Sequence, residues 1–281
     1  MQTIDQLIAD PTALFAINHS GGKDSQAMMI KLLALGIPAR QIVAVHARLG
    51  GKIEHEGTEQ HAQAQCDAAG IKLLIAEAFN ADGSAKTFFS YARRRKAQRP
   101  DAPSFPDGSN ARWCTSELKR DPINRELRRY ANKHGFKAIV SCQGIRAQES
   151  DSRRKKQPFA VEDRLNCAKR PGFVWYPIFD MLVDEVFQTI VDAGQMPHPA
   201  YDLDVATMKP RGNERLSCVF CVMGSPNDLL NGALQRPELF EAYCDLEDEL
   251  GYTMHAFERK PLRQIVAEAK AKRFGTLALA A

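Results

Sequence analysis

The sequence predicts an α/β fold with a parallel sheet, and two observations support this prediction. Short apolar runs alternate with longer amphipathic or polar stretches, as strands alternate with helices in βαβ units. Glycine-rich turns follow the first two apolar runs, at residues 20–25 and 48–51. Because ligands of parallel sheets bind at the carboxyl ends of the strands, we expect both turns at a binding edge.

The predicted elements follow from these apolar runs and from helix-stopping residues such as Gly36 and Gly135. Apolar runs predict strands at residues 13–17, 42–46, 72–76 and 138–142, and a last strand or edge segment at 174–178. The other stretches predict helices at residues 1–12, 23–35, 56–69, 115–134, 183–193, 227–250 (with a break near Pro237) and 256–273. No strand is predicted among the last helices, so we expect a helical extension after the sheet.

Composition narrows the class of protein. Of 281 residues, 44% are apolar, which allows a substantial core, and the formal charge of +4 suits an anionic ligand without requiring nucleic acid. No apolar run is long enough to cross a bilayer and no secretory leader opens the sequence, so we expect a soluble cytoplasmic protein. Seven cysteines then favour free thiols, metal binding or redox chemistry over a disulfide framework.

The sequence SGGKDS at residues 20–25 has the chemistry of an anion site. Gly21 and Gly22 let the backbone approach an oxyanion, and the N–H groups at the start of the following helix favour negative charge. Lys23 adds a full positive charge, and the two flanking serines add hydroxyl groups. We therefore expect a cradle for pyrophosphate or sulfate. The alternative is an ordinary glycine-rich turn.

This loop is shorter than a Walker A motif, and an aspartate follows its lysine. It resembles the PP-loop of the ATP pyrophosphatase and phosphoadenosine phosphosulfate (PAPS) reductase superfamily. Residues 112–122, 144–153 and 218–221 resemble segments that follow the PP-loop in PAPS reductase-like proteins, and the resemblance covers residues 13–255. It implies an adenine nucleotide alpha hydrolase-like (HUP, Rossmann-like) core.

The resemblance also implies a set of site residues. ATP or a related adenine nucleotide would bind with Mg²⁺ at Ser20, Gly21, Gly22, Lys23, Asp24, Ser25, Arg146 and Arg153. Three of these residues would act in catalysis. Lys23 would stabilise charge that develops on the phosphates, Asp24 would orient Mg²⁺ or the loop, and Arg146 would neutralise phosphate or substrate. The nucleotide-binding domain would comprise residues 1–200.

The remaining residues, 201–281, form the expected helical extension, which carries the Cys-x-x-Cys pair Cys218 and Cys221. Such a pair can be a redox dithiol, half of a zinc site or part of an iron–sulfur site. In iron–sulfur relatives a cysteine matching Cys114 joins the pair, which implies a [4Fe–4S] cluster on these three residues. The fourth ligand stays open between a non-protein group and Cys142, Cys167 or Cys244.

Two basic clusters and one further arginine carry alternatives of their own. The runs at residues 93–99 and 153–156 are either solvated surface or contacts for an anionic substrate, the first as a lid that could cover RNA or DNA. Arg48 stands where close relatives tend to have an aspartate that could serve a ribose or a metal. The arginine could bind an anion instead, or mark an altered activity.

The leading hypothesis is an enzyme that splits the α–β phosphate bond of ATP and adenylates an acceptor for sulfur incorporation. The acceptor could be tRNA, DNA or a small molecule, and a partner protein could donate the sulfur. The second hypothesis is reduction of PAPS or adenylylsulfate, although the residues after Cys244 contain no cysteine to attack the sulfate sulfur. The third is a non-catalytic nucleotide- or nucleic-acid-binding module.

Overall fold

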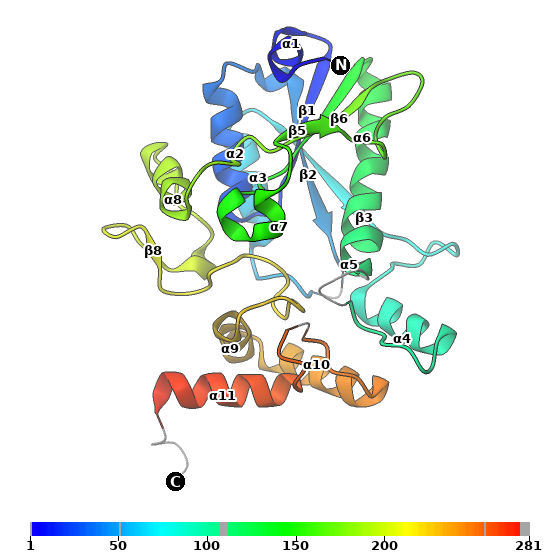
Figure 1. The fold of residues 1–281 in the computed structure, drawn as a ribbon, viewed down its shortest axis with the longest axis vertical. Coiled ribbons are helices and arrows are strands. Elements are labelled where there is room, and N and C mark those ends of the chain that lie inside the picture. Colours follow the sequence, from blue (N-terminus) through cyan, green and yellow to red (C-terminus); the bar gives the residue numbers. More distant parts are fainter. Residues whose placement is uncertain (1, 51, 107–111, 256, 276–281) are drawn as a thin grey trace.

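The computed structural model describes residues 2–50, 52–106, 112–255 and 257–275. At its centre lies a six-stranded sheet in the order β3-β2-β1-β4-β6-β5 (Figure 1). The strands are β1 (Ala13–Asn18), β2 (Ile42–Arg48), β3 (Lys72–Glu77), β4 (Ala138–Cys142), β5 (Phe159–Val161) and β6 (Gly172–Trp175). All neighbours pair in parallel except β5, which runs antiparallel to β6 at the edge. The predicted parallel α/β sheet is confirmed.

Helices cover both faces of this sheet because side chains alternate along its strands. Phe15 and Ile17 of β1 belong to the core on the face that α2 and α8 cover, whereas Leu14 and Ala16 pack on the opposite face, which α6 covers. The helices around the sheet are α1 (Ile4–Ala9), α2 (Lys23–Ala34), α3 (Thr58–Ala68), α6 (Asp121–His134) and α8 (Val183–Asp192). The loop between β1 and α2 therefore leaves the centre of the carboxyl edge.

A second core lies beyond that edge, where the C-terminal helices pack against α4 (Phe88–Gln98) (Figure 1). These helices are α9 (Pro226–Gln235), α10 (Pro237–Leu250) and α11 (Leu262–Phe274). Aromatic rings fill the space between them: Tyr243 of α10 contacts Phe88, Phe89 and Phe220 at centroid distances of 5.5, 4.8 and 5.3 Å. The C-terminal helices thus pack next to the carboxyl edge of the sheet, where the turns that follow β1 and β2 lie.

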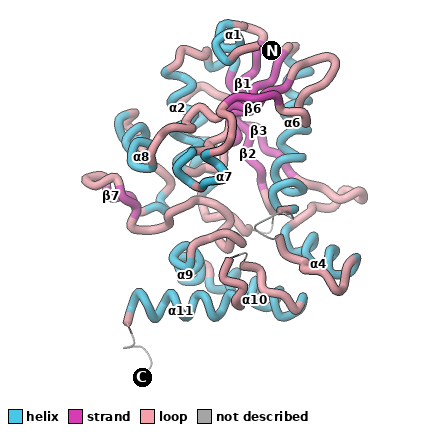
Figure 2. Tube along the Cα trace, viewed as in Figure 1, coloured by secondary structure: helices cyan, strands magenta, loops and turns pink. Residues whose placement is uncertain are grey.

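The structure differs from the predicted elements at several short segments, which Figure 2 distinguishes by colour. Neither β5 nor the hairpin of β7 (Leu203–Asp204) and β8 (Lys209–Pro210) is predicted, because two or three residues are too few to show a strand's alternation. The segment predicted at 174–178 is β6, which begins earlier and lies inside the sheet. The last helix begins at Leu262, after Pro261, rather than at residue 256, which lies outside the described residues.

The helix predicted from residue 115 also begins differently. A short turn, α5 (Trp113–Thr115), leads into a π-helical turn (Ser116–Arg120) and only then into α6. The remaining short elements are η1 (Ala39–Gln41), η3 (Ala147–Glu149), α7 (Asp151–Arg154) and η4 (Pro199–Tyr201). Within the described ranges, no helix combines the length and the apolar character that crossing a membrane requires.

Candidate functional site

The loop between β1 and α2 is held in one conformation by its own groups and by a distant tyrosine. Gly21 has a φ of +75°, and a Cβ atom there would lie 2.7 Å from the Thr58 methyl group, so glycine is required on both counts. The Ser25 hydroxyl donates to the Gly22 carbonyl at 2.8 Å. The Lys23 N–H donates to the hydroxyl of Tyr201 at 3.1 Å. Ser25 and Tyr201 thus fix the loop from either side.

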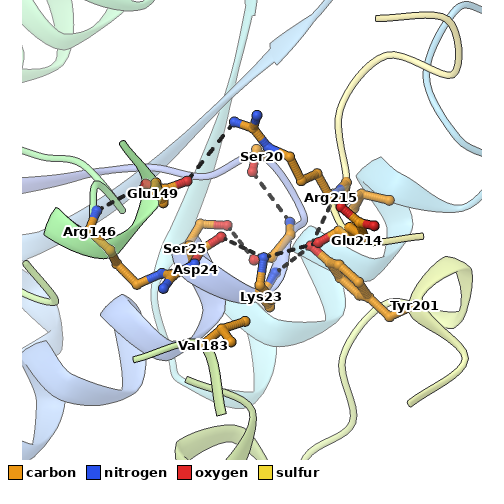
Figure 3. A network of polar contacts seen from close by, with 12 residues as sticks. Ser20, Lys23, Asp24, Ser25, Arg146, Glu149, Val183, Tyr201, Glu214 and Arg215 are labelled. Atoms are coloured by element: carbon orange, nitrogen blue, oxygen red, sulfur yellow. Dashed lines mark hydrogen bonds and ion pairs between the residues drawn. The ribbon is translucent and has the colours of Figure 1, made fainter. Parts of the chain in front are cut away.

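The side chain of Lys23 is almost completely buried and points towards a carboxylate (Figure 3). Its ammonium group lies 3.1 Å from Asp24 Oδ2 and 3.4 Å from the carbonyl oxygen of Glu214. The Tyr201 ring centroid lies 5.3 Å from the ammonium group, which favours the cation further. A positive charge is therefore fixed at the base of the loop.

Arg146 brings a second buried cation to the same carboxylate. It follows β4, and its Nε lies 2.8 Å from Asp24 Oδ1. Gly144 allows this approach, because a Cβ atom there would lie 3.0 Å from the carbonyl carbon of Asp24. Burial alone would raise the pKa of Asp24, but Lys23 and Arg146 outweigh burial and lower that pKa. Asp24 is therefore an anion between two cations.

Glu149 holds the next two arginines. Its carboxylate accepts from Arg153 and lies 4.0 Å from Arg215, and it also accepts from the Arg146 backbone N–H at 3.0 Å. In Figure 3 a dashed line joins Glu149 to Arg215, above Lys23 and Asp24 in this view. Three cations line the pocket beside these residues, Lys23, Arg153 and Arg215, whereas Arg146 lies behind Asp24 and is not part of the lining. An anionic ligand would meet strong positive potential there.

Two cavities meet at this point. A polar pocket of about 160 Å³ is lined by the loop residues and by Glu149, Arg153 and Arg215. A larger cavity of about 420 Å³ lies beside it along the carboxyl edge of the sheet, with Asn18 and Leu216 among the residues that line both. The small pocket suits phosphate groups and the large one suits a nucleoside. Their continuity is what a bound nucleotide requires.

A histidine and a carboxylate line the far side of the larger cavity. His46, the fifth residue of β2, lies with Nε2 3.3 Å from Glu54 Oε1, and its Nδ1 contacts the carbonyl oxygen of His19 at 2.9 Å. Burial alone would lower the pKa of His46, but Glu54 outweighs burial and raises it. This pair can hold or transfer a proton next to a bound nucleotide.

Lys119 lies within electrostatic reach of all three predicted cluster ligands. Cys114 precedes the π-helical turn, and a β-bridge between Glu54 and Cys218 brings the Cys-x-x-Cys segment to the sheet. The thiols of Cys218, Cys221 and Cys114 all act on Lys119 and raise its pKa. Cys218 and Lys119 also line the larger cavity. The sequence-predicted thiol group therefore borders the nucleotide-sized space.

The candidate fourth ligands lie elsewhere. Burial raises the pKa of Cys142, the last residue of β4, whose side chain lies in the core on one face of the sheet. Cys244 is buried, and the charges that act on it come from Arg263 and acidic side chains rather than from thiols. Cys167 is exposed, and its backbone forms an isolated antiparallel β-bridge with Arg170. In the described part of the chain, no three His, Cys, Asp or Glu side chains lie close enough to hold a single metal ion.

Some of the basic side chains bind acidic or carbonyl groups of the protein, whereas others face a cavity. In the first run, Arg93 pairs with Glu249 at 2.7 Å and Lys96 donates to the Pro100 carbonyl at 2.8 Å, which leaves Arg95 facing a further cavity. In the second run, Arg153 lines both nucleotide cavities while its neighbours are exposed. Arg48 is held at the surface by Glu59 and Glu77, at 2.6 and 2.9 Å, and does not line either cavity.

Sequence reasoning missed several residues of the site. Tyr201, Glu149, Arg215, Lys119 and the His46–Glu54 pair carry no motif of their own. Glu149 and Lys119 lie within the segments that resemble PAPS reductase-like proteins, so this resemblance could have indicated them. Tyr201 and Arg215 come from a long loop whose path over the sheet edge no local pattern indicates.

A parallel sheet with an anion pocket on the loop after its first strand defines a Rossmann-like protein of the HUP class. The chain belongs to the phosphoadenosine phosphosulfate reductase domain family, whose model matches residues 15–221. No curated protein matched the sequence.

Solved structures that resemble the chain do so at low identity. PAPS reductase from Candida auris in a phosphate complex matches at 12% identity with a TM-score of 0.40, over 70% of this chain and 79% of that one. An FMN adenylyltransferase from Candida glabrata in complex with FMN and an ATP analogue matches at 11% and 0.41, over 74% of this chain and 58% of that one. The U34-tRNA thiolase NcsA from Methanococcus maripaludis with its [4Fe–4S] cluster matches at 15% and 0.38, over 96% and 75%.

Proposed function

We propose that the chain is a PP-loop ATP pyrophosphatase that adenylates an acceptor for sulfur incorporation. The observation that carries this proposal is the continuity of the polar pocket at residues 20–25 with a nucleoside-sized cavity bordered by Cys218. The pocket would hold the β- and γ-phosphates, and the larger cavity would hold the adenosine. The α-phosphate would then lie between them, near Ser20 and Arg153, which line both.

In this reaction a nucleophilic atom of the acceptor bonds to the α-phosphorus, and the bond from that phosphorus to the oxygen bridging to the β-phosphate breaks. Pyrophosphate leaves with the bonding electrons. Lys23, Arg153 and Arg215, which line the pocket, would stabilise the charge that develops on it. Arg146 would act through Asp24, which it holds in position beside Lys23. The His46–Glu54 pair would accept the proton that the acceptor loses.

Mg²⁺ would be bound mainly by the nucleotide. Over the described residues, no cluster of three acidic or metal-ligating side chains is available as a dedicated site, and both oxygens of Asp24 already contact cations. Mg²⁺ is often held through phosphates with few protein ligands. We therefore assign Asp24 to orienting the loop rather than to the metal.

Cysteine thiols are the ligands that a [4Fe–4S] cluster takes, and Cys114, Cys218 and Cys221 would supply three of them. The three thiols act together on Lys119 and on Tyr243, whose buried hydroxyl has no hydrogen-bond partner among the described residues. Cys114, Cys218 and Cys221 would hold the cluster as thiolates, and the cluster would supply sulfur-carrying chemistry next to the nucleotide. Lys119 would balance the negative charge of the thiolates.

The test is ATP affinity and product analysis with Lys23→Ala. We expect the purified protein to bind ATP and, with water in place of the acceptor, to form AMP and pyrophosphate. Lys23→Ala should weaken ATP binding by about 10–100-fold, as loss of a charge-assisted phosphate contact does. Lys31→Ala, on the same helix but outside both cavities, is the matched control. Equal affinities for Lys23→Ala and the control would sink the PP-loop assignment, and ATP binding without AMP would favour a non-catalytic module.

Reduction of PAPS or adenylylsulfate stays the second candidate, because the family match itself favours it. It predicts thioredoxin-dependent release of sulfite without ATP. Cys244 is poorly suited to attack the sulfate sulfur, since burial raises its pKa to about 12 and keeps the thiol protonated. Sulfite release from either sulfonucleotide would replace the adenylation proposal.

A further inference from the structure

A third cavity, of about 400 Å³, lies on the other side of the turn that carries Cys114. The end of α4, the start of α5 and the π-helical turn line it. Thr115 and Arg120 line both this cavity and the large nucleotide cavity. The two cavities therefore adjoin at these two residues, so a molecule bound in the third cavity would lie next to the large one.

The third cavity is strongly basic. Arg95, Arg112 and Arg120 line it, and the Nε of Arg95 is buried without a hydrogen-bond partner among the described residues. Its acidic member, Glu117, is neutralised by Lys86, whose ammonium group lies 3.0 Å away outside the lining. Among the described residues, Arg120 bonds only through its Nε, which donates to Asp121 at 2.8 Å, and its terminal N–H groups have no partner there. Three arginines with one paired carboxylate match a phosphate-bearing ligand.

The ring of half-buried Tyr91 accompanies these arginines, and Trp113, which is only 4% exposed, supports it from behind. Tyr91 and Trp113 both line the cavity, with ring centroids 4.8 Å apart. The indole N–H donates to the Ser104 carbonyl at 3.1 Å, which fixes the Trp113 ring. Tyr91 and Arg95 are four residues apart on α4, so they lie on one face of the helix and present an aromatic ring beside a guanidinium group. This combination suits a nucleobase next to its phosphate.

We propose that the third cavity binds a nucleotide of a single-stranded nucleic acid, which is the acceptor. This inference rests on the proposed function, because it names the acceptor of the same reaction. Exposed Arg94 and Arg99 extend the positive charge of α4 beyond the cavity, as a backbone of several phosphates requires and a free mononucleotide does not. The strand would place one of its nucleotides at Thr115 and Arg120, beside the adenylate.

The experiment measures binding of fluorescein-labelled single-stranded RNA and DNA of about 16 nucleotides to the full chain without ATP, by anisotropy over a range of salt concentrations. We expect binding that weakens with salt. Arg95→Gln should weaken binding about five- to tenfold and reduce the salt slope by about 1, and Tyr91→Leu should weaken binding about tenfold. RNA and DNA arms distinguish the two kinds of strand.

Arg40→Gln is the matched control, because Arg40 is an exposed arginine at the opposite, amino end of β2. It should bind the strands like the unmodified chain. Thermal unfolding of each variant separates a loss of binding from a loss of fold. Failure of the unmodified chain to bind either strand, or equal losses in Arg95→Gln and Arg40→Gln, overturns the inference. If the chain binds no nucleic acid but still binds ATP and forms AMP, only this inference fails and the proposed function stands. If the chain binds nucleic acid but does not turn over ATP, the proposed function fails instead.

Discussion

Asp24 and Arg146 form an ion pair at 2.8 Å although 122 positions separate them in the sequence. Lys23 approaches the other oxygen of the same carboxylate. The pair links the helix after β1 to the loop after β4, the two neighbouring strands at the centre of the sheet. Because Arg146 is only 5% exposed, its charge depends on this carboxylate for compensation.

Removal of this carboxylate should therefore cost far more than removal of a surface partner. We expect Asp24→Ala to lower the free energy of unfolding by about 2–4 kcal/mol, since it leaves two buried cations unpaired. Glu249→Ala, which breaks the exposed pair with Arg93, should cost less than about 1 kcal/mol. Urea unfolding of both variants at neutral pH measures the difference. Similar losses would show that Asp24 is not needed to compensate these cations.

The second prediction concerns the backbone of the loop. Gly21→Ala introduces a left-handed strain and also places a Cβ atom 2.7 Å from the Thr58 methyl and 3.0 Å from the Thr58 carbonyl oxygen. Gly70→Ala introduces the left-handed backbone strain without a steric clash, because nothing lies within 4 Å of the added Cβ atom. We expect Gly70→Ala to cost about 1 kcal/mol of stability and Gly21→Ala about 2 kcal/mol or more, with weaker ATP binding only for the latter.

These results also show what the sequence could predict. The apolar runs specify the buried strands, and β4 has the predicted bounds, because full burial on both faces leaves a continuous apolar signal. The position of residues 20–25 at the carboxyl edge follows from the same logic. Tyr201 could not be found this way, since its hydroxyl reaches the Lys23 N–H from a loop 178 positions away.

The basic runs mark a different limit of sequence reasoning. A run of like charges gives no information about which members find partners. Arg93 and Arg95 are two residues apart, yet the first pairs with Glu249 of α10 while the second faces a cavity. Arg48 similarly finds two carboxylates at the surface. Tertiary partners, and not the residue type, decide which arginine can meet a ligand.

The third prediction tests the thiol group directly. After anaerobic purification, we expect iron and sulfide in the unmodified chain and a loss of most iron in Cys221→Ser, because a three-thiol set cannot spare a ligand. Cys167→Ser should keep its iron, since Cys167 is exposed in a separate hairpin. An absorption spectrum with an iron and sulfide assay gives the readout. An iron-free, colourless unmodified chain, or zinc in place of iron, would exclude the cluster.

The last prediction concerns His55, which is buried against His198 and Asn213. The amide nitrogen of Asn213 can only donate, and its amide oxygen already accepts from Asn231 at 2.7 Å. His55 Nε2 therefore accepts at 3.1 Å, and the ring must be neutral. Burial, with His198 and Arg236 nearby, lowers the pKa of His55 from 6.5 to about 4. Between pH 6.5 and pH 4, His55 is therefore protonated in the unfolded chain and neutral in the folded chain.

The sign of the effect follows from this difference. The contribution of His55 to stability is fully present above about pH 6.5 and is lost as the pH falls towards 4, with a limiting slope of about 1.4 kcal/mol per pH unit. His55→Gln removes that slope, so the variant should lose about 1 kcal/mol less than the unmodified chain between pH 6 and pH 5. Asp228 and Glu247, whose pKa values burial raises, titrate in both proteins and cancel in the comparison. Urea unfolding at pH 8, 7, 6 and 5 measures both slopes. Parallel curves would mean that His55 is protonated in the folded chain, and that the hydrogen bond from Asn213 is not what holds it.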